Sequence, residues 1–192
     1  MSASVAPIVL VVDDESDVAD AYAAQLEERY TVLTAYSGQE ALETVDETVD
    51  VVLLDRRMPG ISGDEVLSTV RDRGLDSRVA MVTAVDPDFD VIEMPFDDYV
   101  TKPVSREELF ETIERLLTFR SYEAQFQEFY RITTKLATLR ANKSEAELRR
   151  SDAFQDLIDH RDTLRAQLDE TLHSVDDADF PAMFTELQDH SE

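Results

Sequence analysis

The fold of the first part of the chain is decided by residues 8–15, which read IVLVVDDE. The five apolar residues follow one another without interruption, as in a strand that is buried on both faces of a parallel sheet. Asp13 and Asp14 come directly after this run. Residues 49–54, which read VDVVLL, form a second run that is apolar except for Asp50, and it ends in the same way at Asp55. Both runs therefore predict buried strands with carboxylates at their carboxyl ends.

Short apolar runs alternate with amphipathic stretches from residue 8 to residue 118. Ser and Glu residues three apart mark the starts of three helices as capping boxes. The pairs are Ser37 and Glu40, Ser62 and Glu65, and Ser105 and Glu108. Further strands are expected at residues 30–36, 79–83 and 98–101. A strand followed by a helix, five times over, predicts an α/β fold with a five-stranded parallel sheet and helices on both faces.

Two features modify this pattern. Pro87 and Pro95 limit the fourth helix to about two turns, because proline is excluded from helix interiors. After residue 118 the strand pattern disappears and apolar residues recur at helical spacing, with an interruption at Asn142-Lys143-Ser144 and an end before Pro181. Two amphipathic helices must cover their apolar faces against each other, the first domain or a second copy. The predicted parts are an N-terminal arm (1–7), an α/β domain (8–118), a helical hairpin or coiled coil (119–176) and an acidic tail (177–192).

The composition of the 192 residues is strongly acidic, with 43 Asp and Glu against 18 Lys and Arg and a formal charge of −25. The negative electrostatic potential of such a chain opposes non-specific binding to nucleic acids and to anionic membranes. We interpret it as an adaptation to a salt-rich cytoplasm; the alternative is a simple solubility surface. The absence of cysteine excludes disulfides, thiolate zinc sites and thiol catalysis. No apolar run is long enough for a membrane span, so a cytoplasmic protein is expected.

Asp13, Asp14 and Asp55 are the candidate metal ligands. The number of Asp-Asp pairs in this chain is what chance gives for such an acidic composition. Only the position of a pair after a strand therefore indicates a site. In open α/β sheets, sites form outside the carboxyl ends of the strands. Three carboxylates gathered there would repel one another, and a hard divalent cation would relieve the repulsion. Mg²⁺ suits such oxygen ligands and retained waters best.

Thr83 ends the fourth strand and Lys102 follows the fifth, so a hydroxyl and an ammonium should reach the same edge. Each residue taken singly fits a surface or capping role better than a functional one. Together with Asp55 they make the set that phosphoryl transfer to a carboxylate requires.

Residues 8–118 resemble the receiver domain of two-component response regulators. The resemblance rests on motifs in the family's order: Asp13-Asp14-Glu15, Asp55-x-x-Met58-Pro59-Gly60, Thr83-Ala84 and Tyr99-Val100-Thr101-Lys102-Pro103. It implies the strand order 2-1-3-4-5 and a sensor histidine kinase that transfers a phosphoryl group to Asp55. Autophosphorylation from small donors and slow autodephosphorylation are expected, and no other enzymatic activity.

The resemblance also implies roles for single residues. Asp14, Asp55 and the backbone carbonyl of Arg57 would bind Mg²⁺, and Asp13 would act mainly through water. The side chain of Arg57 is expected either near the phosphoryl group or in a surface ion pair.

On the same resemblance, Thr83 and Lys102 would bind the phosphoryl oxygens, and Ala84 would leave room for the threonine to move. Tyr99 matches the aromatic residue that turns inward on activation. The peptide bond between Lys102 and Pro103 would be cis. The interval from Thr83 to Lys102 is short for the family, which puts the usual dimer contact of this face in doubt.

The tail resembles the HalX domain of haloarchaeal proteins. The resemblance rests on the acidic helical pattern, on the Pro-x-Phe-Asp variant of the fourth segment and on residues 134–136 and 143–148. We expect signalling through a downstream protein partner, with a homodimer through the tail helices as a further expectation. The alternatives are a phosphorylation-dependent DNA-binding regulator and a phosphate relay without output. The basic residues of the tail spread over half a helix, which favours a solvated or partner-facing surface over DNA contact; they are Arg131, Lys135, Arg140 and Lys143. His160, His173 and His190 are expected to be exposed and not catalytic.

Overall fold

A computed structural model describes residues 6–85, 87 and 89–174 of the chain. The chain divides into two compact units, Met1–Leu117 and Thr118–Glu192, and each is described by itself. The predicted acidic tail (177–192), Pro181, His190 and most of the predicted N-terminal arm lie outside the described residues.

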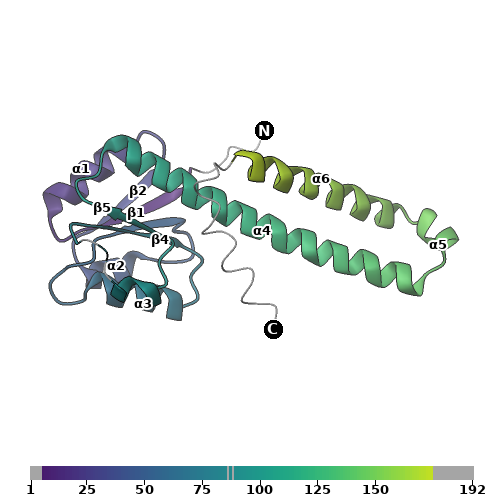
Figure 1. The fold of residues 1–192 in the computed structure, drawn as a ribbon, viewed down its shortest axis with the longest axis horizontal. Coiled ribbons are helices and arrows are strands. Elements are labelled where there is room, and N and C mark those ends of the chain that lie inside the picture. Colours follow the sequence, from purple (N-terminus) through teal and green to yellow (C-terminus); the bar gives the residue numbers. More distant parts are fainter. Residues whose placement is uncertain (1–5, 86, 88, 175–192) are drawn as a thin grey trace. The chain divides into compact units, whose positions relative to one another are not determined.

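The first unit is built on a five-stranded parallel sheet in the order β2-β1-β3-β4-β5, which confirms the predicted fold class (Figure 1). The strands are β1 (Ile8–Val12), β2 (Thr31–Ala35), β3 (Val51–Leu54), β4 (Arg78–Thr83) and β5 (Asp98–Thr101). Val12, the last residue of β1, is paired in register with Leu54, the last residue of β3. The next residues along the two strands, Asp13 and Asp55, therefore lie side by side at one edge of the sheet.

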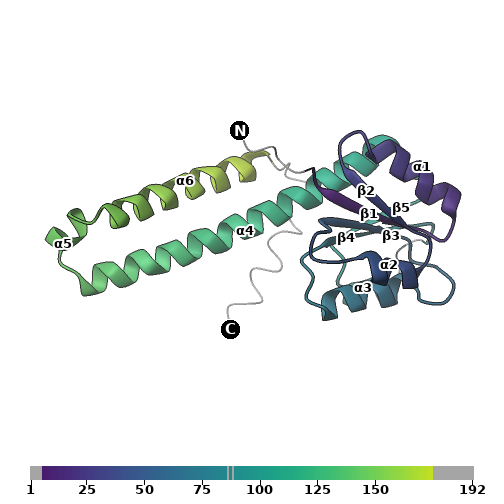
Figure 2. The same ribbon diagram turned by 180° about the vertical axis from the view of Figure 1, so that it is seen from behind.

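Helices cover both faces of this sheet, as Figures 1 and 2 show. They are α1 (Ser16–Leu26), α2 (Gly38–Thr44), α3 (Gly63–Asp72) and the beginning of α4 (Arg106–Asn142). Alternate residues of each central strand point to opposite faces. Leu10 and Val12 pack in the core with α2 and α3, and Val9 and Val11 pack in the core with α1 and α4. Both faces are buried, so the central strands read as unbroken apolar runs.

Local signals place the helix ends. Ser62 and Glu65 form a complete capping box at the start of α3. At the start of α2, Ser37 accepts a hydrogen bond from the amide of Glu40, but the carboxylate of Glu40 accepts from the amide of Tyr36 instead of closing the box. Among the described residues between β4 and β5, the one helix is a short 3-10 helix, η1 (Phe89–Glu93), in agreement with the limit that the prolines set.

The second unit contains the rest of α4, together with α5 (Glu145–Arg149) and α6 (Asp152–Ser174). Within this unit α6 runs back alongside α4 in both views (Figures 1 and 2). Its apolar core is formed by Ile132, Leu136, Phe154 and Leu164. The prediction of one continuous second helix is wrong, because Ser151 starts a new helix by accepting a hydrogen bond from the amide of Phe154. In the described part of the chain, no helix is long and apolar enough to cross a membrane.

Candidate functional site

The side chain of Lys102 joins the two buried carboxylates at the carboxyl edge of the sheet. Its Nζ lies 2.5 Å from Oδ2 of Asp13 and 3.1 Å from Oδ1 of Asp55. Asp13 follows β1, Asp55 follows β3, and Lys102 follows β5, so three strands place the three side chains. Asp13 and Asp55 are among the few polar residues that are buried in the first unit.

The charge of Lys102 is maintained by these two neighbours. Burial lowers the pKa of the ammonium, but the hydrogen bonds and negative charges of Asp13 and Asp55 outweigh it and raise the pKa above its ordinary value. Lys102 is therefore cationic at neutral pH. One positive charge faces two carboxylates, which leaves an excess of negative charge at the site.

The second carboxylate oxygen of Asp55 is held by the loop that follows β3. Oδ2 accepts a hydrogen bond from the amide of Arg57 at 2.9 Å, and the amide of Asp55 donates to the carbonyl of Val12 at 2.9 Å. Met58 anchors the loop in the core from the other side. The side chain of Arg57 is exposed.

Lys102 joins two of the three predicted carboxylates, Asp13 and Asp55, and the third, Asp14, is exposed. Across residues 6–85, 87 and 89–174, no group of three acidic or histidine side chains is arranged to hold a metal ion. The donor set nevertheless fits Mg²⁺, which is typically bound by one or two carboxylates and keeps several waters. Asp13 and Asp55 supply two hard oxygen ligands with uncompensated charge.

Thr83 is buried at the end of β4 and is linked through the following loop to Tyr99. The Oγ1 of Thr83 accepts a hydrogen bond from the amide of Val85 at 3.4 Å, and the hydroxyl of Tyr99 donates to the carbonyl of Val85 at 2.7 Å. The Tyr99 ring packs against Phe96, with 5.5 Å between centroids. The peptide bond between Lys102 and Pro103 is cis, as the resemblance implies.

Tyr22 is a neighbour of the site that the sequence did not single out. It lies on α1, where its helical spacing assigned it to the core, and it packs with the core beneath α1 and α4. Burial raises the pKa of its hydroxyl, and the charges of Asp13 and Asp55 add to this while Lys102 opposes it. No sequence motif marks a tyrosine at this position.

Two family models match the chain. The model described as the response regulator receiver domain matches residues 9–114, and the model of the HalX domain matches residues 118–184. A protein of Haloferax volcanii named "Putative transcriptional regulator" is 50% identical over 161 residues, which cover 83% of this chain and 28% of the relative. The chain thus spans little more than a quarter of that relative's length.

Solved structures similar to this one are receiver domains. The response regulator protein TrrA of Thermotoga maritima, in complex with Mg²⁺-BeF, is 34% identical with a TM-score of 0.50, and the match covers 58% of this chain and 99% of that one. A Francisella response regulator receiver domain is 32% identical with a TM-score of 0.53, over 58% of this chain and 96% of that one. The receiver model matches more than half of the chain and the strand order is that of the receiver fold, so the chain belongs to the response regulator receiver family, with a HalX domain following its receiver domain.

Proposed function

We propose that this response regulator accepts a phosphoryl group from a sensor histidine kinase on Asp55, with Mg²⁺, and signals through its helical C-terminal domain by protein–protein interaction. The observation that carries the proposal is the position of Asp55. It is a buried carboxylate at the edge of the sheet, and Lys102 bridges it to Asp13. A regulatory phosphoacceptor needs such a nucleophile beside a fixed positive charge.

In the proposed transfer, a carboxylate oxygen of Asp55 attacks the phosphorus of a phosphohistidine. The new P–O bond forms as the P–N bond breaks, and the leaving imidazole nitrogen regains a proton. Lys102 faces the negative charge of the transferred group because its ammonium already contacts Asp55. A bound Mg²⁺ would neutralise phosphoryl oxygens, with Asp13, Asp14, Asp55 and the carbonyl of Arg57 as its proposed ligands.

The same site would return the chain to its resting state. Water attacks the acyl phosphate, the P–O bond to Asp55 breaks, and inorganic phosphate leaves the free carboxylate. Thr83 would hold a phosphoryl oxygen in the phosphorylated state. Its hydrogen bond with Val85 links that event to Tyr99, which donates to the same residue.

A protein partner is favoured for the output because the chain is strongly acidic and several basic residues of the helical unit already contact neighbouring side chains. Arg131 pairs with Glu128, and Lys143 pairs with Glu147. The guanidinium of Arg140 lies 6.0 Å from the centre of the Phe154 ring. The formal charge of −25 on the chain opposes a phosphate backbone, whose neutralisation dominates the affinity of DNA-binding proteins.

The second candidate function is that of a DNA-binding transcriptional regulator, which the name of the Haloferax relative favours. The two functions differ in their response to DNA. Binding of labelled DNA to the beryllofluoride-treated chain, titrated with KCl, should show no sequence preference if the partner is a protein. A sequence-specific complex that depends on beryllofluoride would establish the second function instead.

The phosphoacceptor is tested by incubation with acetyl phosphate and MgCl2, followed by intact-mass analysis. The wild-type chain should gain one phosphoryl group, which hydroxylamine removes because an acyl phosphate is labile. Asp55→Asn should gain none. Asp76→Asn changes an exposed aspartate away from the site and is the matched control, which should behave as wild type. Phosphorylation that persists in Asp55→Asn, or that needs no Mg²⁺, would contradict the proposal.

A further inference from the structure

Arg56 stands between the two residues whose groups are proposed to hold Mg²⁺ on this loop, Asp55 and Arg57. Its side chain is 11% exposed, although it is an arginine in a loop. The Nε atom donates to Oδ1 of Asp64 at 3.1 Å and Nη2 donates to Oδ2 at 3.2 Å. The guanidinium and the carboxylate therefore meet with two parallel hydrogen bonds, which is the strongest geometry for such a pair.

The main chain of Arg56 is held by the same helix. The amide of Gly63, the first residue of α3, donates to the carbonyl of Arg56 at 2.9 Å. A Cβ atom at Gly63 would lie 2.2 Å from the carbonyl oxygen of Asp55, so only glycine allows α3 to begin this close to the loop. The first turn of α3 thus contacts both the main chain and the side chain of Arg56.

These contacts fix one peptide plane at both ends. The carbonyl of Arg56 accepts from Gly63, and the amide of Arg57, in the same peptide group, donates to Oδ2 of Asp55. The orientation of the Asp55 carboxylate is thereby tied to the start of α3. Asp64 is the second residue of that helix, where its negative charge is favourable.

We propose that the ion pair between Arg56 and Asp64 positions the phosphoacceptor loop, so that the carboxylate of Asp55 and the loop that carries the carbonyl of Arg57 are held in place for Mg²⁺ before the ion arrives. The inference rests on the function proposed above and adds a positioning residue to it. Arg56 touches neither the metal nor the phosphoryl group in this account. It acts through the peptide group that it shares with Arg57.

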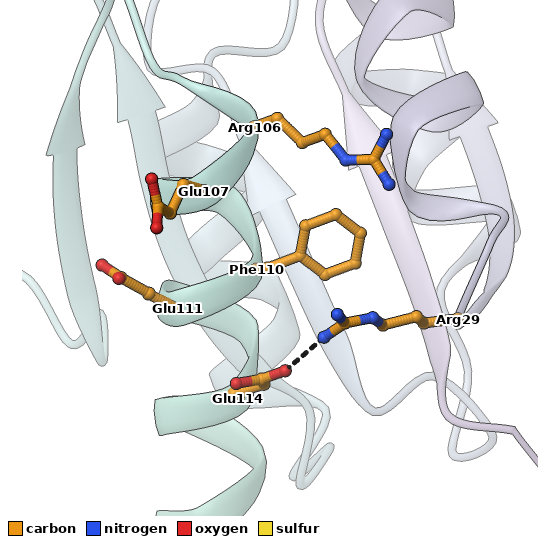
Figure 3. Close-up of a pocket in the computed structure, with 6 residues that line it drawn as sticks. All are labelled: Arg29, Arg106, Glu107, Phe110, Glu111 and Glu114. Carbon is orange, nitrogen blue, oxygen red and sulfur yellow. Dashed lines mark hydrogen bonds and ion pairs between the residues drawn. The ribbon is translucent and has the colours of Figure 1, made fainter.

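A second ion pair of the first unit serves as a control, because it shows whether the loss of any ion pair changes Mg²⁺ binding. Arg29, in the turn after α1, pairs with Glu114 of α4 beside Phe110 in a surface pocket (Figure 3). Both side chains of the pair are 57% exposed, and neither residue belongs to the loop after β3. Exposed pairs of this kind contribute little to stability. Arg29→Gln is therefore the matched control for Arg56→Gln.

The experiment measures Mg²⁺ binding directly, by titration calorimetry with MgCl2 alone in molar KCl. We expect Arg56→Gln to weaken Mg²⁺ binding about tenfold, the usual effect of removing a group that orients a metal ligand. Arg56→Lys should also weaken it, because lysine cannot form two parallel hydrogen bonds. Arg29→Gln should bind as wild type. The double variant Arg56→Gln with Asp64→Asn should lose no more affinity than Arg56→Gln, because the pair acts as a unit.

Two results would overturn the inference. The first is that the Arg56→Lys variant folds and binds Mg²⁺ as tightly as the wild type. A lowered melting temperature with unchanged affinity in Arg56→Gln is the other, since it would assign the pair a structural role only. Failure of the proposed function gives a different result, because wild-type protein itself would then bind no Mg²⁺ and take no phosphoryl group on Asp55.

Discussion

The guanidinium of Arg71 lies 2.5 Å from Oδ2 of Asp97 and so fastens the end of α3 to the segment before β5. Arg78 pairs with the other oxygen of Asp97 at 2.7 Å, and the amide of Val79 donates to Oδ2 at 2.7 Å. Arg71 also donates to the carbonyls of Ser77 and Pro95. One carboxylate thus organises the region where a full fourth helix would otherwise stand.

Asp97→Asn should therefore destabilise the first unit. The change weakens several charge-assisted hydrogen bonds to a side chain that is mostly buried, and each such bond contributes about 1.5–3 kcal/mol. We expect the free energy of unfolding to fall by about 2–4 kcal/mol in urea titrations, with an unchanged m-value. Glu114→Gln, which disrupts an exposed pair, should cost less than about 1 kcal/mol. Equal losses in the two variants would refute this assignment.

Removal of Lys102 should cost stability in a way that Mg²⁺ reverses. Lys102→Met leaves Asp13 and Asp55 buried together without a cation, and breaking such a pair costs about 3–5 kcal/mol. A divalent ion at the two carboxylates would restore the missing charge. The unfolding free energy of the variant should therefore rise more with added MgCl2 than that of the wild type. Equal responses to MgCl2 in both proteins would count against a shared binding place.

Stability should fall as the pH rises past about 10. Burial raises the pKa of Tyr22 and Tyr30 above the ordinary 10.0, and Asp13 and Asp55 raise that of Lys102 despite its burial. A group with a raised pKa in the folded state stabilises the protein fully below its unfolded pKa and loses this contribution as the pH rises through the folded pKa. Melting temperatures between pH 8 and pH 11 test this. Tyr22→Phe should flatten the alkaline decline, and Tyr130→Phe, at an exposed tyrosine, should not.

Tyr99→Phe should loosen the loop after β4 without abolishing phosphorylation. The variant loses only the hydrogen bond to the carbonyl of Val85, which contributes about 1 kcal/mol. Amide exchange at Val85 should therefore become about fivefold faster. Hydrogen exchange with mass spectrometry after acetyl phosphate treatment measures both effects in one sample. Exchange at the wild-type rate would show that the hydroxyl does not hold the loop.

Concentrated KCl should stabilise the chain. A net charge of −25 produces self-repulsion at low ionic strength, and the screening length falls to about 3 Å at 1 M salt. The melting temperature should rise as KCl is increased from 0.1 M to several molar. Sodium sulfate at matched ionic strength separates screening from general salting-out. A melting temperature that falls with KCl would exclude the adaptation to salt.

The sheet and its functional edge could be predicted because local signals determine them. Strands buried on both faces must be continuous apolar runs, and the carboxyl ends of parallel strands share one edge. Asp55 and Lys102 were therefore predicted to lie at the same edge before any contact was known. The resemblance added the strand order and the cis bond at Pro103, which are not local properties of composition.

Other features could not be predicted because they depend on contacts between distant residues. The bond from Lys102 to Asp13 joins residues 89 positions apart. Asp13 is buried and Asp14 is exposed, and the dipeptide alone does not reveal this difference. Arg56 carries no signal in the sequence, because nothing there marks Asp64, one acid among many, as its partner. The break before α6 did have a signal in Ser151, which caps the new helix.

Lys102 is the only lysine among the residues of the first unit, since the other two, Lys135 and Lys143, belong to the second. A reagent that modifies amines therefore meets a single ε-amine on that unit, the one that contacts Asp13 and Asp55. An acylating reagent becomes a reporter of the site without any engineered label. The rate at which the Nζ of Lys102 is acylated shows whether the amine is still in contact with the two carboxylates.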